Sequence, residues 1–185
     1  MYYVIYVGAG KEARAQNLIR QMVSKTSYED CFYPIRHMNK KIHGTWTEVY
    51  ERLLPGYLFL VSEDICSFYR ELRAIPMFLN LLGREELDEQ TDFYPLKEEE
   101  IRWLTSLLGN TGYQTSHTSG ECVIERSQVD FDENDHVVIL SGPLLGMEGR
   151  IRKLNLHKRY AEVELEFMNT VTVLHLGIEM IEKQN

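Results

Sequence analysis

The sequence has few of the residues that build metal centres, disulfide frameworks or membrane spans. Its three cysteines, Cys31, Cys66 and Cys122, include no CxxC pair, and an odd, widely spaced set fits a reducing cytoplasm. No stretch approaches the ~20 apolar residues of a membrane helix, and the first residues lack the pattern of a secretion signal. We therefore expect a cytoplasmic protein with no membrane partner.

Catalytic motifs are equally scarce. The six histidines are scattered without the H-x-x-x-H or H-E-x-x-H spacing of a metal site. The glycines at 142, 146 and 149 lack the lysine and hydroxyl of a phosphate-binding loop. The acidic pairs are typical of charged residues in loops and at the starts of helices. Cys31 and Cys66 are expected to pack as small hydrophobic residues. We expect no metal, no cofactor and no enzymatic activity.

What is present is enough chain for a real core. The sequence has 185 residues, of which 44% are hydrophobic and 26% charged, which is ordinary for a globular protein. The formal net charge is -8, so any contact with nucleic acid must come from a local basic patch.

The first part of the chain mixes strand and helix patterns. The helix signals are apolar residues at helical spacing, such as Ala15, Leu18, Ile19 and Met22. The strand signals are short apolar or β-branched runs, and a polar stretch with one glycine, residues 40–47, reads as an exposed hairpin. We predict strands at 2–7, 31–36, 57–61 and 78–82, helices from 11, at 64–73 and at 98–108, and a surface loop at 84–92.

The second part carries only strand signals after a linker-like stretch at 109–120. Glu162, Glu164 and Glu166 alternate with Val163, Leu165 and Phe167, a clean period of two. We predict strands at 136–140, 150–154, 160–167, 170–175 and 178–181. The fold class is therefore α+β, with a ferredoxin-like domain of antiparallel sheet and helices at 1–109, a linker at 110–130 and a small all-β, SH3-like barrel at 131–185.

A Pro-Gly turn delivers a tyrosine to the start of a buried strand in Leu53-Leu54-Pro55-Gly56-Tyr57-Leu58-Phe59-Leu60. A strand-entry turn with a core tyrosine is the plain interpretation. Further aromatics near turns, at Tyr2, Tyr3, Tyr6 and Phe78, without catalytic polar groups, favour an apolar groove that receives a partner helix.

These segments resemble the NusG family. The resemblance covers nearly the whole chain in the family's order, through Tyr2-Tyr3-Val4, Gly10-Lys11-Glu12, residues 53–59, Ile75-Pro76-x-Phe78 and residues 95–101, which are similar to an NGN domain. Residues 135–151, with the Gly-Pro turn and two further glycines, resemble a KOW domain. Residues 157–168 are similar to the KOW domains of specialised paralogues of the LoaP antiterminator type.

The resemblance implies an NGN domain that binds the clamp helices of the RNA polymerase largest subunit through an apolar groove and suppresses pausing. The implied polymerase-binding residues are Tyr2, Leu54, Pro55, Gly56, Tyr57 and Phe78. Tyr2 stands where the family often has tryptophan. Arg70 and Arg73 correspond to a helix face near upstream non-template DNA.

Two basic groups stand out in this acidic chain. The first is Arg36, His37, Lys40, Lys41 and His43, and the second is Arg150, Arg152, Lys153, His157, Lys158 and Arg159. Solvated loops are the plain interpretation of each, whereas the LoaP-like resemblance implies binding of a nascent RNA hairpin. The expected nucleic-acid-binding residues are Arg36, Lys40, Lys41, Arg70, Arg73, Lys153, His157, Lys158 and Arg159.

The expected function is thus transcription elongation and antitermination in a target operon. Two alternatives remain open. One is a general elongation or Rho-linked factor whose KOW domain binds a protein, such as Rho or a ribosomal protein. The other is a ribosome-associated module that uses KOW for ribosomal RNA.

Overall fold

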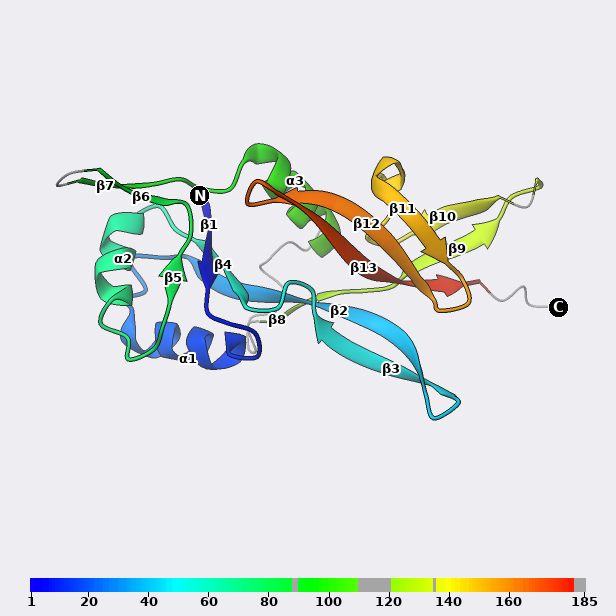
Figure 1. Ribbon diagram of the computed structural model, residues 1–185, viewed down its shortest axis with the longest axis horizontal. Helices are drawn as coiled ribbons and strands as arrows, with labels where there is room; N and C mark the ends of the chain where they lie inside the picture. The colour runs from blue at the N-terminus through cyan, green and yellow to red at the C-terminus, as the bar shows by residue number, and fades with distance from the viewer. Residues whose placement is uncertain (88–89, 110–120, 135, 182–185) are drawn as a thin grey trace. The chain divides into compact units, whose positions relative to one another are not determined.

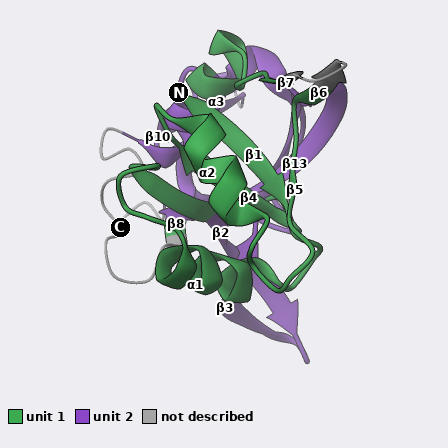
Figure 2. Ribbon diagram, turned by 90° about the vertical axis from the view of Figure 1, so that its left-hand side faces the viewer, with its two compact units in different colours: residues 1–33, 54–102, 113–122 green, residues 34–53, 103–112, 123–185 purple. Residues whose placement is uncertain are grey.

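The computed structural model describes residues 1–87, 90–109, 121–134 and 136–181, and Figure 1 follows the chain from blue β1 to red β13. Two compact units are coloured in Figure 2. The first unit comprises the described parts of residues 1–33, 54–102 and 113–122, and the second those of 34–53, 103–112 and 123–185. No described helix has the length and apolar character needed to cross a membrane.

The elements follow one another in this order. They are β1 (Tyr2–Tyr6), α1 (Glu12–Met22), β2 (Asp30–Ile42), β3 (Thr45–Arg52), β4 (Tyr57–Val61), α2 (Ile65–Leu72), β5 (Asn80–Leu81), β6 (Arg84–Leu87), β7 (Gln90–Phe93), α3 (Glu98–Leu108), β8 (Glu121–Ile124), β9 (Ser127–Phe131), β10 (Val137–Ser141), the 3-10 turn η2 (Glu148–Arg150), β11 (Ile151–Asn155), β12 (Tyr160–Phe167) and β13 (Thr170–Met180).

The first unit is built on an antiparallel sheet in which the strands follow the order β2-β4-β1-β5. β1 pairs with β4 on one side and β5 on the other, and β4 also pairs with residues 30–32 of β2. The rings of Phe32 and Phe59 stack in its core at 5.6 Å between centroids. Ala15 and Ile19, four residues apart on α1, are both buried, because that spacing puts them on one face of a helix.

The second unit contains a five-stranded sheet in the order β10-β9-β13-β12-β11. All its pairs are antiparallel except β9 with β13, which is parallel. Along β12 the residues Ala161, Val163, Leu165 and Phe167 are buried, as the predicted alternation requires. These elements confirm the α+β class with a β-rich second part.

A long hairpin of β2 and β3 also belongs to the second unit. Its register runs from Ile35 opposite Arg52 to Ile42 opposite Thr45. The turn residues His43 and Gly44 have φ of 49° and 86°, values that a tight hairpin turn requires at both positions. The hairpin predicted at 40–47 is therefore confirmed, and its strands extend well beyond those limits.

Some predicted elements were wrong. Residues 84–87 and 90–92 belong to strands rather than to a loop, because β6 and β7 pair antiparallel, with Arg84 opposite Phe93 and Leu87 opposite Gln90. The two strands predicted at 170–175 and 178–181 are the single strand β13. Glycine at position 177 allows β2 to approach this strand closely, since a Cβ there would lie 2.4 Å from the carbonyl oxygen of His37.

Other predictions were incomplete. The strand predicted at 78–82 is reduced to the two residues of β5, and β8 and β9 were not predicted as strands. Most of the linker-like stretch, residues 110–120, lies outside the described residues.

Candidate functional site

The Pro-Gly turn is built against the loop that follows β1. Gly56 has φ of 92°, which favours glycine, and its carbonyl accepts a hydrogen bond of 2.7 Å from the N–H of Val7. Pro55 is exposed, Gly56 is buried and Tyr57 is half-buried. Leu54 is only 7% exposed, so it supports the turn from within the core rather than lining an open surface.

A buried carboxylate fixes this turn. Oε1 of Glu12 accepts hydrogen bonds from the backbone N–H of Gly56 at 2.6 Å and of Gly10 at 3.1 Å. Hydrogen bonds to a charged acceptor are stronger than neutral ones, so Glu12 ties the Pro55–Gly56 turn to the loop between β1 and α1.

Aromatic side chains gather at one end of this sheet. The rings of Tyr6 and Tyr57 lie 5.3 Å apart at 57°, and Tyr6 is 38% exposed. Phe78, 70% exposed, comes two residues before Asn80, which pairs with Tyr6. Tyr57 is half-buried and contacts Tyr6, which the sequence grouped with the aromatic residues near turns but did not include among the expected polymerase-binding residues.

Tyr2 is not part of this cluster. It lies at the opposite end of β1, paired with Val61, whereas Tyr6 is paired with Tyr57. The two tyrosines are four positions apart along the strand, which corresponds to roughly 13 Å.

The predicted Arg70 and Arg73 lie together on α2. Both line a cavity of about 630 Å³ together with Cys66, Tyr69 and Phe93. Arg70 donates from Nη2 to the hydroxyl of Ser67 at 3.1 Å. Cys66 is exposed and Cys31 buried, so the expectation of apolar packing was wrong for Cys66. Burial raises the pKa of the Cys31 thiol to about 12.

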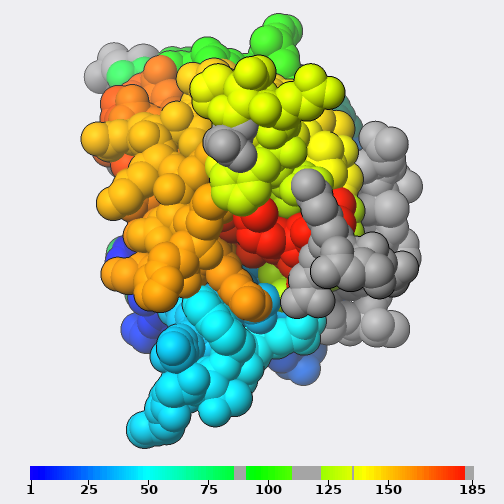
Figure 3. All heavy atoms as spheres, turned by 90° about the vertical axis from the view of Figure 1, so that its right-hand side faces the viewer, coloured from blue at the N-terminus to red at the C-terminus, as the bar shows by residue number. Residues whose placement is uncertain are grey.

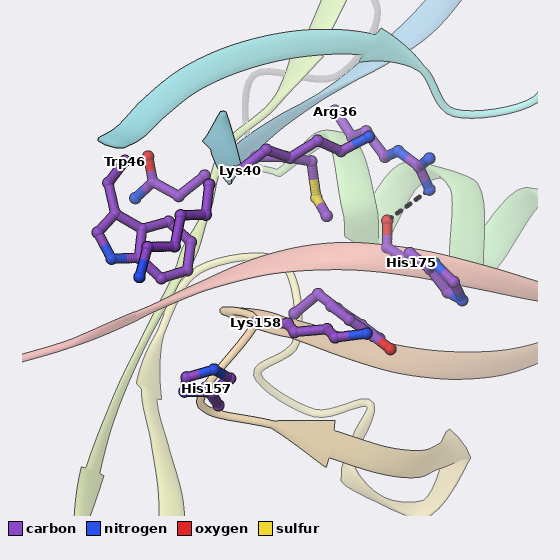
Figure 4. Close-up of a pocket in the computed structure, with 10 residues that line it drawn as sticks. Arg36, Lys40, Trp46, His157, Lys158 and His175 are labelled. Atoms are coloured by element: carbon purple, nitrogen blue, oxygen red, sulfur yellow. Dashed lines mark hydrogen bonds between the residues drawn. The ribbon is translucent and has the colours of Figure 1, made fainter. Parts of the chain in front are cut away.

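The second unit brings the two basic groups together. A cavity of about 400 Å³, which we call the basic cavity, is lined by Arg36, Lys40 and Lys41 from β2 and by His157 and Lys158 from the β11–β12 turn. Figure 4 shows Arg36 and Lys40 on the hairpin side of the cavity and His157 and Lys158 on the barrel side. In Figure 3 the cyan atoms of the hairpin lie directly against orange atoms of the barrel.

The turn between β11 and β12 positions its cationic residues. Oδ1 of Asn155 accepts the backbone N–H of Lys158 at 2.9 Å, and Arg159 adopts φ of 57°. The guanidinium carbon of Arg159 lies 4.2 Å from the ring centroid of Trp46, a cation–π contact that joins the turn to the hairpin.

Glu51 neutralises part of the cavity's charge. It pairs with Lys40 Nζ at 2.5 Å and with Arg36 Nη2 at 3.2 Å. The hydrogen bond from Lys40, followed by the charges of Lys40 and Arg36, lowers the pKa of the Glu51 carboxyl. Arg36 also donates from Nη1 to the carbonyl of His175 at 2.9 Å. Arg36 and Lys40 are thus already paired with other groups of the protein.

Lys41 and Lys158 differ from that pair. Both are exposed, and neither has a carboxylate within ion-pair distance in the described part of the chain. Their charges therefore face solvent at the cavity.

Three aromatic side chains line the basic cavity, and the sequence did not point to any of them. They are Trp46, Tyr160 and His175. Tyr160 and His175 stack at 4.8 Å with 22° between their planes. Trp46 is 36% exposed. The available signal was a tryptophan in a polar hairpin, two residues after its glycine.

Three other basic residues lie elsewhere. His37 is buried, with Nδ1 2.8 Å from Glu125 Oε2 and its ring stacked on Tyr50 at 4.5 Å, so its placement in a solvent-facing basic group was wrong. Lys153 is exposed on β11 and does not line the cavity. Arg152 pairs with Glu164 at 3.1 Å. Among the described residues, no cluster of three potential ligands could hold a metal ion.

Residues 1–105 match the family model described as transcription termination factor nusG. The chain belongs to the NusG family. It is therefore a NusG-like transcription termination/antitermination factor, in a family of transcription factors rather than enzymes.

Relatives of similar length support this assignment. The NusG termination/antitermination protein of Thermus thermophilus is 20% identical over 98% of this chain and 97% of its own length. That of Streptococcus pyogenes is 22% identical over 97% of this chain and 94% of its own.

A solved structure on domain interaction in Thermotoga maritima NusG shares the fold. Its TM-score is 0.50 at 19% identity, over 95% of this chain and 92% of that one. This NusG likeness confirms an NGN-type α+β domain followed by a KOW-type β domain.

Proposed function

We propose that this NusG-family protein is a LoaP-type antitermination factor. It binds RNA polymerase through its NGN domain and a nascent RNA hairpin through its basic residues, suppressing pausing and termination in a target operon. We assign the NGN domain to 1–109, the linker to 110–130 and the KOW domain to 131–185.

The observation that carries the RNA part is the basic cavity. Residues from two basic groups more than a hundred positions apart in the sequence line it together. In a chain of net charge -8, such a local concentration of cations directs phosphates to one surface. Lys153 and Arg159 extend the same basic region in sequence.

The polymerase part rests on the Tyr6–Tyr57 ring pair and on the exposed Phe78, which lies two residues before the partner of Tyr6 in β5. An accessible apolar surface next to a rigid turn suits the apolar face of a partner helix, and the clamp helices of the largest subunit are the partner that the family resemblance implies. Arg70 and Arg73 would meet upstream non-template DNA. RNA binding raises the effective concentration of this surface near the polymerase, which confines action to transcripts that carry the hairpin.

A second candidate is a general NusG-like factor whose KOW domain binds Rho or a ribosomal protein. Val171 and Val173 on β13 are 66% and 38% exposed, and exposed apolar strand residues favour a protein partner.

The test separates the two surfaces. We expect Tyr57→Ala to weaken binding to RNA polymerase in a pull-down while RNA affinity stays unchanged, and Lys41→Ala/Lys158→Ala to do the reverse in a gel shift with the operon's leader RNA. Removing two phosphate contacts should also reduce the slope of log affinity against log salt by about two.

Each variant has a matched control. Tyr94→Ala removes an exposed tyrosine of the first unit, outside the Tyr6–Tyr57 contact, and Arg152→Ala removes a positive charge that Glu164 already pairs. If the lysine variant leaves the salt-dependent RNA affinity intact, the assignment of RNA to the basic cavity is wrong. Binding of Rho or a ribosomal protein without RNA binding would support the second candidate.

A further inference from the structure

The basic cavity has the dimensions of a small-ligand site. Its volume is about 400 Å³, within the roughly 300–1,000 Å³ that such sites span. An RNA duplex is far too wide to enter it. A single nucleotide that is turned out of a strand is small enough to enter.

The walls of the cavity are flat and aromatic. Trp46 comes from β3, Tyr160 from β12 and His175 from β13. Because Arg159 covers one face of the Trp46 ring and Arg36 holds the His175 backbone, these side chains are held in place before any ligand arrives. Stacking on such rings is how proteins hold unpaired bases.

The polar groups complete a nucleotide site. Lys41 and Lys158 face solvent without carboxylate partners, as described above, and suit the phosphates on either side of a base. Asn39, only 6% exposed, also lines the cavity, and its amide offers both a donor and an acceptor to the edge of a base.

We propose that the basic cavity binds one unpaired nucleobase of an RNA strand, stacked on Trp46 beside the Tyr160–His175 pair. The inference rests on the proposed function in taking RNA as the ligand, and adds that the RNA must present a loop or bulge. A fully paired stem places its bases inside the duplex, where these rings cannot reach them.

The experiment uses the full chain and two stem-loop RNAs with equal numbers of phosphates. One has adenines in its loop, and in the other the loop nucleotides are abasic. We expect the abasic RNA to bind roughly 5- to 150-fold more weakly, the range of stacking one base on an aromatic side chain. In Trp46→Ala the two RNAs should bind equally, and Trp46→Phe should restore most of the preference.

Tryptophan fluorescence gives a second measurement. Trp46 should be quenched by the adenine loop but not by the abasic loop. Trp103 is 3% exposed and donates its ring N–H to the carbonyl of Glu166, so it supplies a constant background.

The outcomes distinguish this inference from the proposed function. If the unmodified protein binds both RNAs equally and in a salt-dependent way, the basic cavity does not bind a nucleobase (the base site), whereas the proposed RNA binding still holds. Binding of neither RNA overturns the proposed function and the base site together. Displacement of the adenine loop by poly-glutamate at equal charge concentration would assign the cavity to an acidic protein and overturn the base site.

Discussion

At the scale of single residues, Glu51 sets how much of the basic cavity's charge is available. Its carboxylate forms ion pairs with both Lys40 and Arg36. Lys41 and Lys158, in contrast, face solvent. An acidic residue inside a phosphate-binding region costs affinity, but here it also holds two long side chains in fixed positions.

The Glu51→Gln variant should be less stable than the unmodified protein, by an amount that depends on pH. The pKa of Glu51 is lowered from its ordinary value of 4.5, so the folded state prefers the charged form. Its stabilising contribution is therefore present above that pH and lost as pH falls through the lowered pKa. For this partly exposed group we expect about 0.2–1 kcal/mol at neutral pH. Urea denaturation should show a difference between the two proteins at neutral pH that vanishes in acid. A difference that persists in acid would contradict the ion-pair origin.

At the scale of elements, the Pro55–Gly56 turn combines backbone strain with close packing. A Cβ on Gly56 would meet Tyr6 Cε2 at 3.0 Å, the Ala9 nitrogen at 3.1 Å and the Gly8 carbonyl carbon at 3.2 Å. The turn, the Tyr6 ring and the loop after β1 are therefore packed against one another without room for a side chain at position 56.

Gly56→Ala should destabilise the protein more than Gly10→Ala does. Both glycines have positive φ, 92° and 81°, so both substitutions pay a strain of about 1–2 kcal/mol. Only Gly56 adds close contacts, since a Cβ on Gly10 meets nothing within 4 Å, and overpacking adds about 1–3 kcal/mol. Denaturant unfolding measures both. Equal losses of stability would show that the surrounding loop yields freely.

The elements also show what the sequence could and could not predict. The strand at 160–167 was predicted with its observed bounds because one face is buried and the other is not. The β6–β7 hairpin was missed because Arg84, Glu85 and Asp92 are charged and neither face carries an apolar alternation. Tyr94 donates to Glu85 at 3.0 Å, a contact between side chains that no periodicity reports.

At the scale of the whole molecule, the cavity residues were only half predictable. The lysines stood out as basic residues in an acidic chain, but Trp46, Tyr160 and His175 become neighbours only through the pairing of Tyr160 with Gly177 and the docking of the hairpin. The spacing of residues along the chain does not reveal contacts between side chains that lie so far apart in the sequence. The residues proposed to bind the polymerase were predicted from turn chemistry and family resemblance, whereas the Tyr6–Tyr57 contact needed coordinates.

The proposed function requires both surfaces on one chain, because tethering works only within one molecule. We expect an equimolar mixture of Tyr57→Ala and Lys41→Ala/Lys158→Ala proteins to fail to restore transcriptional readthrough in vitro on a template with the leader hairpin, where the unmodified protein succeeds. Restoration by the mixture would show that the two contacts act independently.

The parallel pairing of β9 with β13 imposes an order of events during translation. β9 is matched to Ile178–Met180, so its free edge has no strand to join until that stretch has emerged from the exit tunnel. His175, which forms one wall of the cavity, is carried by the same late strand. A chain stalled before that point therefore exposes an unpaired strand edge, which is a template for aggregation, and lacks one wall of the cavity.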